Sequence, residues 1–196
     1  MESATILSVL QPFIKVLDNL AISYYIGGSI ASSIYGLPRS TMDIDIVADI
    51  RSNHITQLKQ NLEREFYIDE DMIKEAVARL SSFNLIHLES AMKIDVFILQ
   101  RDSYQCGTLK RRQKDTLIEN DVNSVFYFAS PEDIILNKLK WYQKGNRISE
   151  RQWLDILGVI KVQANSLDRD YLTNWARKLD IYDLLVDAFS EAEASK

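Results

Sequence analysis

Cysteine and histidine are scarce in this 196-residue sequence, and each scarcity excludes a class of site. The single cysteine, Cys106, can form neither an intramolecular disulfide nor a cysteine-based metal centre, which is typical of a protein in a reducing compartment. The two histidines, His54 and His87, have no acid or cysteine at ligand spacing, so we expect both to be structural or surface residues. The sequence also lacks a Gly-x-Ser-x-Gly elbow and a Walker phosphate loop, which excludes serine hydrolases and P-loop enzymes.

The sequence also lacks long apolar runs, and it lacks the net positive charge that general nucleic-acid binding needs. No run approaches the roughly 20 residues needed to cross a bilayer, and the N-terminus does not resemble a signal peptide. We therefore expect a cytoplasmic protein without a membrane partner. The net charge of -5 excludes a broad nucleic-acid surface. One cationic run, Lys110, Arg111, Arg112 and Lys114, leaves two interpretations open, a local nucleic-acid contact or a solvated surface.

The hydrophobic pattern predicts one core followed by a helical region. Apolar residues at helical spacing predict helices over residues 4–20, with a start or kink at Pro12, and over 29–35, 54–65, 70–80 and 130–142. Three further helical segments follow residue 149, with breaks near Asn165 and Asp180. Strands are predicted over 23–26, 41–47, 82–89 and 92–99, with a more polar strand pair within 108–129. We expect residues 1–129 to form the core and residues 130–196 a helical region packed on it.

Two aspartates occupy one face of the predicted strand over 41–47. Thr41, Asp43, Asp45 and Val47 alternate with Met42, Ile44 and Ile46, so the two carboxylates leave the same face within roughly 7 Å of each other. A bound divalent cation relieves their repulsion, and Mg²⁺ prefers carboxylate and phosphate oxygens. The alternative is a strand edge that shows two acids to water.

Asp95 supplies a third acid on a strand of the same pattern, opposite Ile94 and Val96. A sheet that pairs the two strands brings the three acids together, and such a set can hold two metal ions about 3.5–4 Å apart for in-line phosphoryl chemistry. Asp95 would then be the nearest acceptor for the proton of the attacking hydroxyl. Lys93 lies on the same face, either as a phosphate ligand or as an ion-pair partner.

Gly27, Gly28 and Ser29 form the complementary half of the candidate site. Glycines at the end of a strand let a ligand approach the backbone closely, and a helix that begins at Ser29 offers free N–H groups to a phosphate. Such turns are common. This one gains weight because it stands shortly before the aspartate pair, with a single predicted helix between them.

The combined pattern resembles the nucleotidyltransferase superfamily, which has the DNA polymerase β-like fold. The resemblance rests on Gly27 to Ser29, on the Arg-x-Thr-x-Asp-Ile-Asp run from Arg39 to Asp45, and on Lys93 to Val96. The later segments Ser130 to Asp133, Lys138-Leu139 and Arg151 to Asp155 resemble, more narrowly, the abortive-infection (AbiEii-like) nucleotidyltransferases, which include type IV toxins. The similarity covers roughly residues 20 to 160.

The resemblance implies an α+β fold with a mixed sheet, packed helices and a C-terminal helical segment. It also implies an NTP cosubstrate and two Mg²⁺ ions, with Asp43, Asp45 and Asp95 as metal ligands. Gly27, Gly28 and Ser29 would bind the triphosphate. Lys138 would steady phosphate, and Arg39 and Thr41 would help to position the nucleotide or the loop. These last three side chains have plainer alternatives, a solvated helix cation for Lys138 and a loop brace for Arg39 and Thr41.

Two functional hypotheses follow from these residues. The first is an active, metal-dependent nucleotidyltransferase, a toxin or phage-defence component, whose acceptor is RNA such as tRNA, a protein, or a small molecule such as an aminoglycoside or lincosamide. The second is a catalytically idle member of the same fold that acts as a binding or regulatory partner, in the manner of an antitoxin. Three acids on one face favour the first hypothesis, since a binding module has no need of them.

Overall fold

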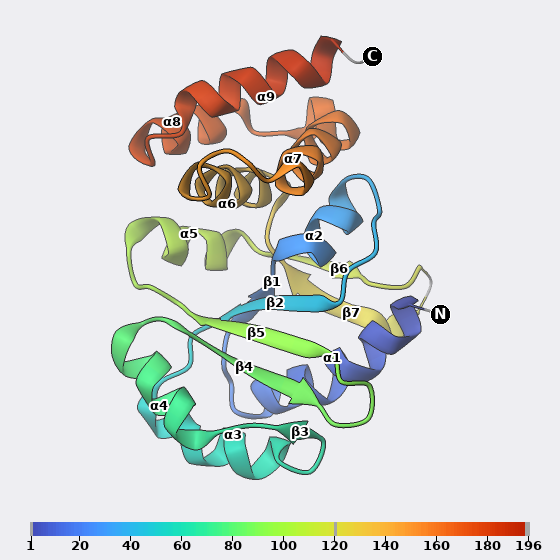
Figure 1. Ribbon diagram of the computed structural model, residues 1–196, viewed down its shortest axis with the longest axis vertical. Coiled ribbons are helices and arrows are strands. Elements are labelled where there is room, and N and C mark those ends of the chain that lie inside the picture. The colour runs from blue at the N-terminus through green and yellow to red at the C-terminus, as the bar shows by residue number, and fades with distance from the viewer. Residues whose placement is uncertain (1, 120, 195–196) are drawn as a thin grey trace. The chain divides into compact units, whose positions relative to one another are not determined.

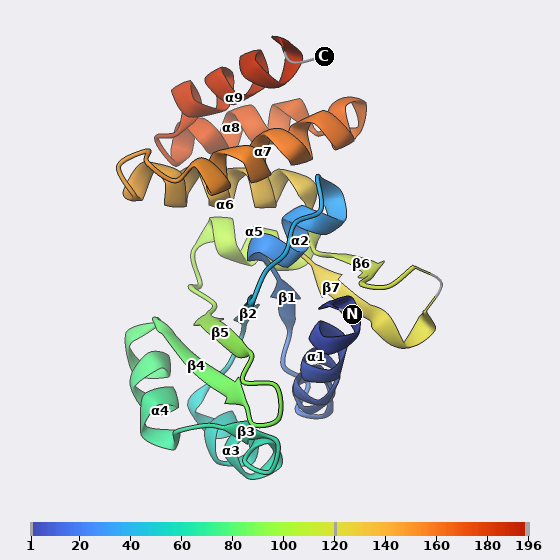
Figure 2. The same cartoon turned by 45° about the vertical axis from the view of Figure 1, so that its right-hand side comes forward.

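The computed structural model describes residues 2–119 and 121–194 (Figures 1 and 2). The chain divides into two compact units. The first unit comprises residues 1–27 and 40–128, and the second comprises residues 28–39 and 129–196. The long segment of the second unit begins at residue 129, and residues 28–39 group with it. In the described part of the chain, no helix combines the length and apolarity needed to span a membrane.

The first unit contains a seven-stranded mixed sheet with the order β3-β4-β5-β2-β1-β7-β6. Its strands are β1 (Tyr24–Ile26), β2 (Asp43–Ala48), β3 (Phe66–Tyr67), β4 (Ser82–His87), β5 (Lys93–Ile98), β6 (Gln113–Thr116) and β7 (Val125–Phe128). The pairs β2–β5 and β1–β7 are parallel and the other neighbours are antiparallel. Figure 1 shows β2 and β5 side by side in the middle of this sheet.

The described residues of the first unit form four α-helices. They are α1 (Glu2–Asn19), α3 (Ile55–Leu62), α4 (Glu70–Arg79) and α5 (Ser103–Arg111), and short 3₁₀ turns lie at Ser52–His54 and Val122–Ser124. The fully buried ring of Phe13 on α1 packs edge-on against Phe66 of β3, with ring centroids 6.3 Å apart. His87 of β4 continues this cluster and its Nδ1 lies 2.9 Å from the Ser90 hydroxyl, so it is structural, as predicted.

The second unit is helical. Its helices are α2 (Gly28–Tyr35), α6 (Pro131–Lys144), α7 (Glu150–Gln163), α8 (Arg169–Lys178) and α9 (Tyr182–Ala194), with a 3₁₀ turn at Ala164–Ser166. Figure 2 shows α6 to α9 stacked against one another. Ser130 caps α6 by accepting a hydrogen bond from the Asp133 N–H, and Pro131 occupies the first turn, which confirms the predicted start of this helix. The predicted breaks near Asn165 and Asp180 are confirmed as well.

Several sequence predictions need correction. Residues 108–111 end helix α5 and are not part of a strand, so the predicted strand pair begins only at residue 113. β2 begins at Asp43, and Met42 is 73% exposed in the preceding bend instead of lying on the buried face. Pro12 lies inside α1 and neither starts nor ends the helix. The two-residue strand β3 was missed because it is too short to show alternation.

Candidate active site

Three aspartates lie on one face of the sheet in the first unit. β2 and β5 pair in parallel, with Asp45 directly opposite Asp95 and Asp43 opposite Lys93. The alternate residues of both strands, among them Ile44 and Ile94, are buried in the core. Because side chains alternate between faces, core burial of one set turns all the carboxylates to the other side. The structure therefore brings Asp43, Asp45 and Asp95 to one face, as the alternating pattern predicts.

The ammonium group of Lys93 lies among these carboxylates. Its Nζ is 2.7 Å from Oδ2 of Asp95 and 3.8 Å from Oδ1 of Asp43. The hydrogen bond to Asp95 raises the pKa of Lys93 above its ordinary value, and the charges of Asp43 and Asp45 add to the rise. Lys93 is therefore charged at neutral pH and offsets part of the repulsion between the acids.

The carboxylate oxygens on this face suit a hard divalent cation, but in this structure they bind the Lys93 ammonium. Carboxylate oxygens are the ligands that Mg²⁺ prefers, and the Lys93 ammonium stands where a cation is stabilised by two of the acids. Across residues 2–119 and 121–194, no three His, Cys, Asp or Glu side chains are grouped so as to hold a metal ion. A metal ion at this face would thus compete with Lys93 for the Asp95 carboxylate.

Gly27 joins the end of β1 to the acid-bearing strand. Its N–H donates a 2.9 Å hydrogen bond to the carbonyl of Asp45. A Cβ added at Gly27 would meet only the edge of the Tyr25 ring, at 4.0 Å, and the backbone of Gly27 is not in the left-handed region. Neither packing nor backbone strain therefore requires a glycine here, and the space in front of its backbone is open to a ligand.

Gly28 and Ser29 belong to the second unit and begin α2. Gly28 has a φ of 54°, which glycine adopts without steric cost. The first turn of α2 contains no acidic residue, so no side chain there offsets the positive end of the helix dipole. The hydroxyl oxygen of Ser29 accepts a hydrogen bond from Arg39, so this hydroxyl is already part of a polar network.

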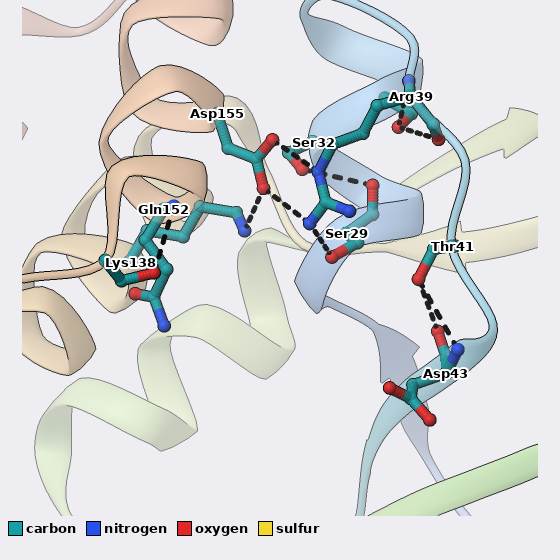
Figure 3. A network of polar contacts seen from close by, with 10 residues as sticks. Ser29, Ser32, Arg39, Thr41, Asp43, Lys138, Gln152 and Asp155 are labelled. Carbon is teal, nitrogen blue, oxygen red and sulfur yellow. Dashed lines mark hydrogen bonds and ion pairs between the residues drawn. The ribbon is translucent and has the colours of Figure 1, made fainter. Parts of the chain in front are cut away.

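A buried ion-pair network is centred on Asp155 in the second unit (Figure 3). Arg39 binds its carboxylate through Nε at 2.8 Å and through Nη2 at 3.0 Å. Lys138 Nζ binds Oδ2 of the same carboxylate at 2.8 Å. The Asp155 and Lys138 side chains are only 4% and 10% exposed. Both oxygens of the Asp155 carboxylate therefore accept charge-assisted hydrogen bonds, Oδ1 from Arg39 and Oδ2 from Arg39 and Lys138.

Burial and hydrogen bonding act in opposite directions on Asp155. Burial raises the pKa of its carboxyl, but the hydrogen bonds from Arg39 and Lys138 outweigh that effect and hold the pKa below its ordinary value. Asp155 was given no role from the sequence, although one signal was available. It is an acid within the apolar run Trp153 to Ile160, and an acid in such a run is buried only when it is paired.

Thr41 braces the start of β2. Its hydroxyl donates to the Asp43 carbonyl at 3.2 Å and accepts from the Asp43 N–H at 3.4 Å. These contacts match the interpretation of Thr41 as a brace. They also fix the backbone that carries the Asp43 carboxylate.

Comparison with known proteins connects this arrangement to a fold. No model of a protein family matches the sequence, and no curated protein matches it significantly. A nucleotidyltransferase-like protein from Paracoccidioides brasiliensis is 20% identical and has a TM-score of 0.56, with 96% of this chain and 92% of that chain covered. The chain has the nucleotidyltransferase fold.

A second match supports the same fold. ANT(2'')-Ia in complex with adenylyl-2''-tobramycin is 11% identical, with a TM-score of 0.59 over 90% of this chain and 97% of that chain. The solution structure of the same antibiotic-resistance factor matches with a TM-score of 0.54 at 12% identity and covers 100% of this chain and 98% of that chain. The mixed α+β nucleotidyltransferase fold predicted from the sequence is thereby confirmed.

Proposed function

We propose that this chain is a metal-dependent nucleotidyltransferase that transfers a nucleotide from an NTP to an acceptor. The observation that carries the proposal is the in-register placement of Asp45 beside Asp95, with Asp43 on the same face. A central strand pair gains no stability from three acids on one face, because their mutual repulsion weakens the sheet. The nucleotidyltransferase fold of the solved relatives supports the same reaction type.

In this proposal Asp43, Asp45 and Asp95 hold two Mg²⁺ ions, which when bound would polarise the triphosphate and the attacking hydroxyl. Asp95 is the proposed acceptor for the proton of that hydroxyl. Since Lys93 donates a hydrogen bond to Oδ2 of Asp95, it competes for that oxygen with a metal ion and with the proton of the hydroxyl.

The proposed contacts to the nucleotide come from the glycine turn and from the cationic network. The open backbone at Gly27 and the N–H groups of Gly28 and Ser29 suit a triphosphate. The Lys138 ammonium and the Arg39 guanidinium, both held by Asp155, are the cations proposed to contact phosphate. Asp155 acts as a positioning residue in this scheme, since it orients both cations.

Three acceptor classes are compatible with this chemistry. The adenylylated tobramycin in the ANT(2'')-Ia structure supports a small-molecule acceptor, with ATP as the NTP. The resemblance to abortive-infection proteins supports RNA, and with it a toxin or phage-defence role and an antitoxin or regulatory partner. A protein acceptor is the third class. A cytoplasmic location suits all three.

The experiment incubates pure protein and Mg²⁺ with each α-labelled NTP, using total RNA, cell protein or tobramycin as acceptor. We expect label transfer by the wild type and at least about a 100-fold loss in Asp45→Asn, since a direct metal ligand should matter at least as much as its supporting residues. The matched control is Asp49→Asn, because Asp49 follows the same strand but pairs with Arg51 and Arg101. Equal transfer by wild type and Asp45→Asn would refute the assignment.

The second candidate is the catalytically idle binding partner, and one observation favours it. The single positive charge of Lys93 lies 2.7 Å from Asp95 and 3.8 Å from Asp43, so it offsets part of the repulsion on this face without a metal ion. The two candidates differ in metal binding. Titration with Mn²⁺, followed by the proton relaxation of water, should show saturable binding for the active enzyme that Asp45→Asn abolishes. An idle partner would show none.

A further inference from the structure

A polar pocket of about 220 Å³ lies in the first unit, away from the aspartates. Its lining comes from the end of α1, the start of β1, the residue after α5, and β7, with Asp18, Ser23, Tyr24, Arg112 and Tyr127 as its polar side chains. The volume is several times the roughly 30 Å³ of one water molecule. It is below the roughly 300–1,000 Å³ of pockets for drug-sized ligands. A pocket of this size suits a flat, polar ring.

One wall of the pocket is a stack of an arginine on a tyrosine. The Arg112 guanidinium carbon lies 4.4 Å from the centroid of the Tyr127 ring. Arg112 donates from Nη1 to the carbonyl of Leu109 at 2.5 Å, but its Nε is buried and has no hydrogen-bond partner within the described chain. A buried, unsatisfied donor costs stability, which makes Arg112 an exception among buried polar groups.

Other lining residues present groups suited to the edge of a base. Asp18 offers carboxylate oxygens and Ser23 a hydroxyl. Tyr24 is buried, its ring packs edge-on against Tyr127 at 5.8 Å, and its phenol is hydrogen-bonded to the Tyr127 backbone, so it supports the wall. A carboxylate and a hydroxyl accept and donate hydrogen bonds as a base edge requires. The stacked pair of Arg112 and Tyr127 offers a plane on which a base can stack.

Cations extend along the chain on both sides of the pocket. Lys114 Nζ lies 5.2 Å from the Tyr127 centroid, and the exposed Lys110 comes two residues before Arg112. Because the chain as a whole carries a net charge of -5, a local run of cations beside a stacking platform is unexpected for ordinary surface. This run of cations provides more positive charge than the phosphate of one mononucleotide requires, so it suits a ligand with several phosphates.

We propose that this pocket binds one base of a single-stranded nucleic acid, and that Lys110 and Lys114 contact the flanking phosphates. Stacking on aromatic rings beside a positive track is the general mode of single-strand recognition. The pocket is distinct from the acidic face, because Tyr24 pairs with Ala48, at the end of β2 opposite Asp43. Five residues of strand correspond to roughly 17 Å. This inference goes beyond the proposed nucleotide transfer and does not depend on it.

The test measures fluorescence anisotropy of a labelled octameric RNA of mixed sequence, without NTP and without Mg²⁺. Asp45→Asn serves as the background, so that binding is measured whether or not the chain transfers nucleotides. Tyr127→Ala should weaken octamer binding by about 5- to 150-fold, the range expected for the loss of one base–aromatic stack. The matched control is Tyr67→Ala, because Tyr67 is a 62% exposed tyrosine on β3 outside the pocket. It should bind like the background.

A second measurement keeps the proposal testable if the Tyr127 variant does not fold. Lys110→Gln replaces an exposed side chain and should reduce the slope of log affinity against log salt concentration by about 0.7, the value for one phosphate contact on a single strand. Equal octamer binding by the Tyr127 and Tyr67 variants, with both folded, would overturn the proposal. An unchanged salt slope in Lys110→Gln, or a labelled mononucleotide that binds as tightly as the octamer, would overturn it as well.

Discussion

The ion-pair network around Asp155 predicts a large and specific loss of stability when its centre is neutralised. Asp155→Asn keeps the size of the side chain but removes its charge, which leaves the Lys138 ammonium uncompensated in a position that is 10% exposed. Breaking a buried pair by removing one partner costs about 3–5 kcal/mol in the free energy of unfolding. Arg39 adds less to this cost, because its side chain is 33% exposed and water can solvate it.

Tryptophan fluorescence is the appropriate assay for this variant. All three tryptophans, Trp141, Trp153 and Trp175, belong to the second unit, so urea unfolding followed by their emission reports on the unit that contains the network. The matched double variant, Asp155→Leu with Lys138→Met, replaces the buried pair by apolar side chains and should recover at least half of the lost stability. A loss below about 1 kcal/mol in Asp155→Asn, or no recovery in the double variant, would refute the reasoning.

The same network predicts a pH dependence with a definite sign. The folded-state pKa of Asp155 is below its ordinary value of 3.8, so the folded state prefers the ionised carboxylate. The advantage of the wild type over Asp155→Asn should therefore be fully present above pH 3.8, and it should disappear as the pH falls through the lowered folded-state pKa. Urea unfolding of both proteins at several pH values measures this, and a stability difference that grows toward low pH would contradict it.

Four further substitutions concern glycines and the acidic face. Gly36→Ala should lower stability by about 1–3 kcal/mol in thermal unfolding, because the added Cβ would lie 2.8 Å from the backbone of Ser32. In the same assay Gly107→Ala should raise stability by about 0.5–1 kcal/mol, because Gly107 lies within α5 and an added Cβ would meet open space. Gly27→Ala should leave the melting temperature unchanged but weaken binding of a fluorescent NTP, since open space faces its backbone; unchanged binding would remove Gly27 from the site. Lys93→Gln should lower stability by up to about 1 kcal/mol in low salt without divalent ions, and added Mg²⁺ should restore it.

Side-chain alternation made the acidic face predictable from sequence. On β2 and β5, Ile44, Ile46, Ile94 and Val96 must face the core, so the acids between them must face away, whatever the order of the strands. The start of α6 was predictable for an equally local reason, because Ser130 supplies the cap that the first turn needs. Features set by two or three neighbouring residues are thus accessible without a structure.

Features that depend on distant partners were not accessible in this way. Lys138 and Asp155 lie 17 residues apart on successive helices, and no local pattern names either as the partner of the other until α6 and α7 pack together. The grouping of residues 28–39 with residues 129–196 depends on packing between α2 and α7, where Gly36 permits close backbone contact with Val159. The polar, cation-rich stretch over 108–111 carries no clear apolar period, and its helix is settled instead by the Asp102 cap.

The two functional hypotheses differ in whether a metal ion can displace Lys93 from the acids. Its ammonium stabilises the acids by Coulomb attraction, but it brings a single charge and donates to Asp95 at 2.7 Å while Asp43 stays at 3.8 Å. A divalent cation brings twice the charge and can bind several carboxylate oxygens at about 2.1 Å. In an active enzyme it should therefore displace the Lys93 ammonium from the Asp95 carboxylate. The pKa of Lys93 is raised in the absence of metal, so an active enzyme should show that pKa falling on addition of Mg²⁺, measured by NMR of a ¹³C-labelled Lys93 side chain. In an idle partner the pKa of Lys93 would remain raised at every Mg²⁺ concentration, because Asp95 would keep its lysine.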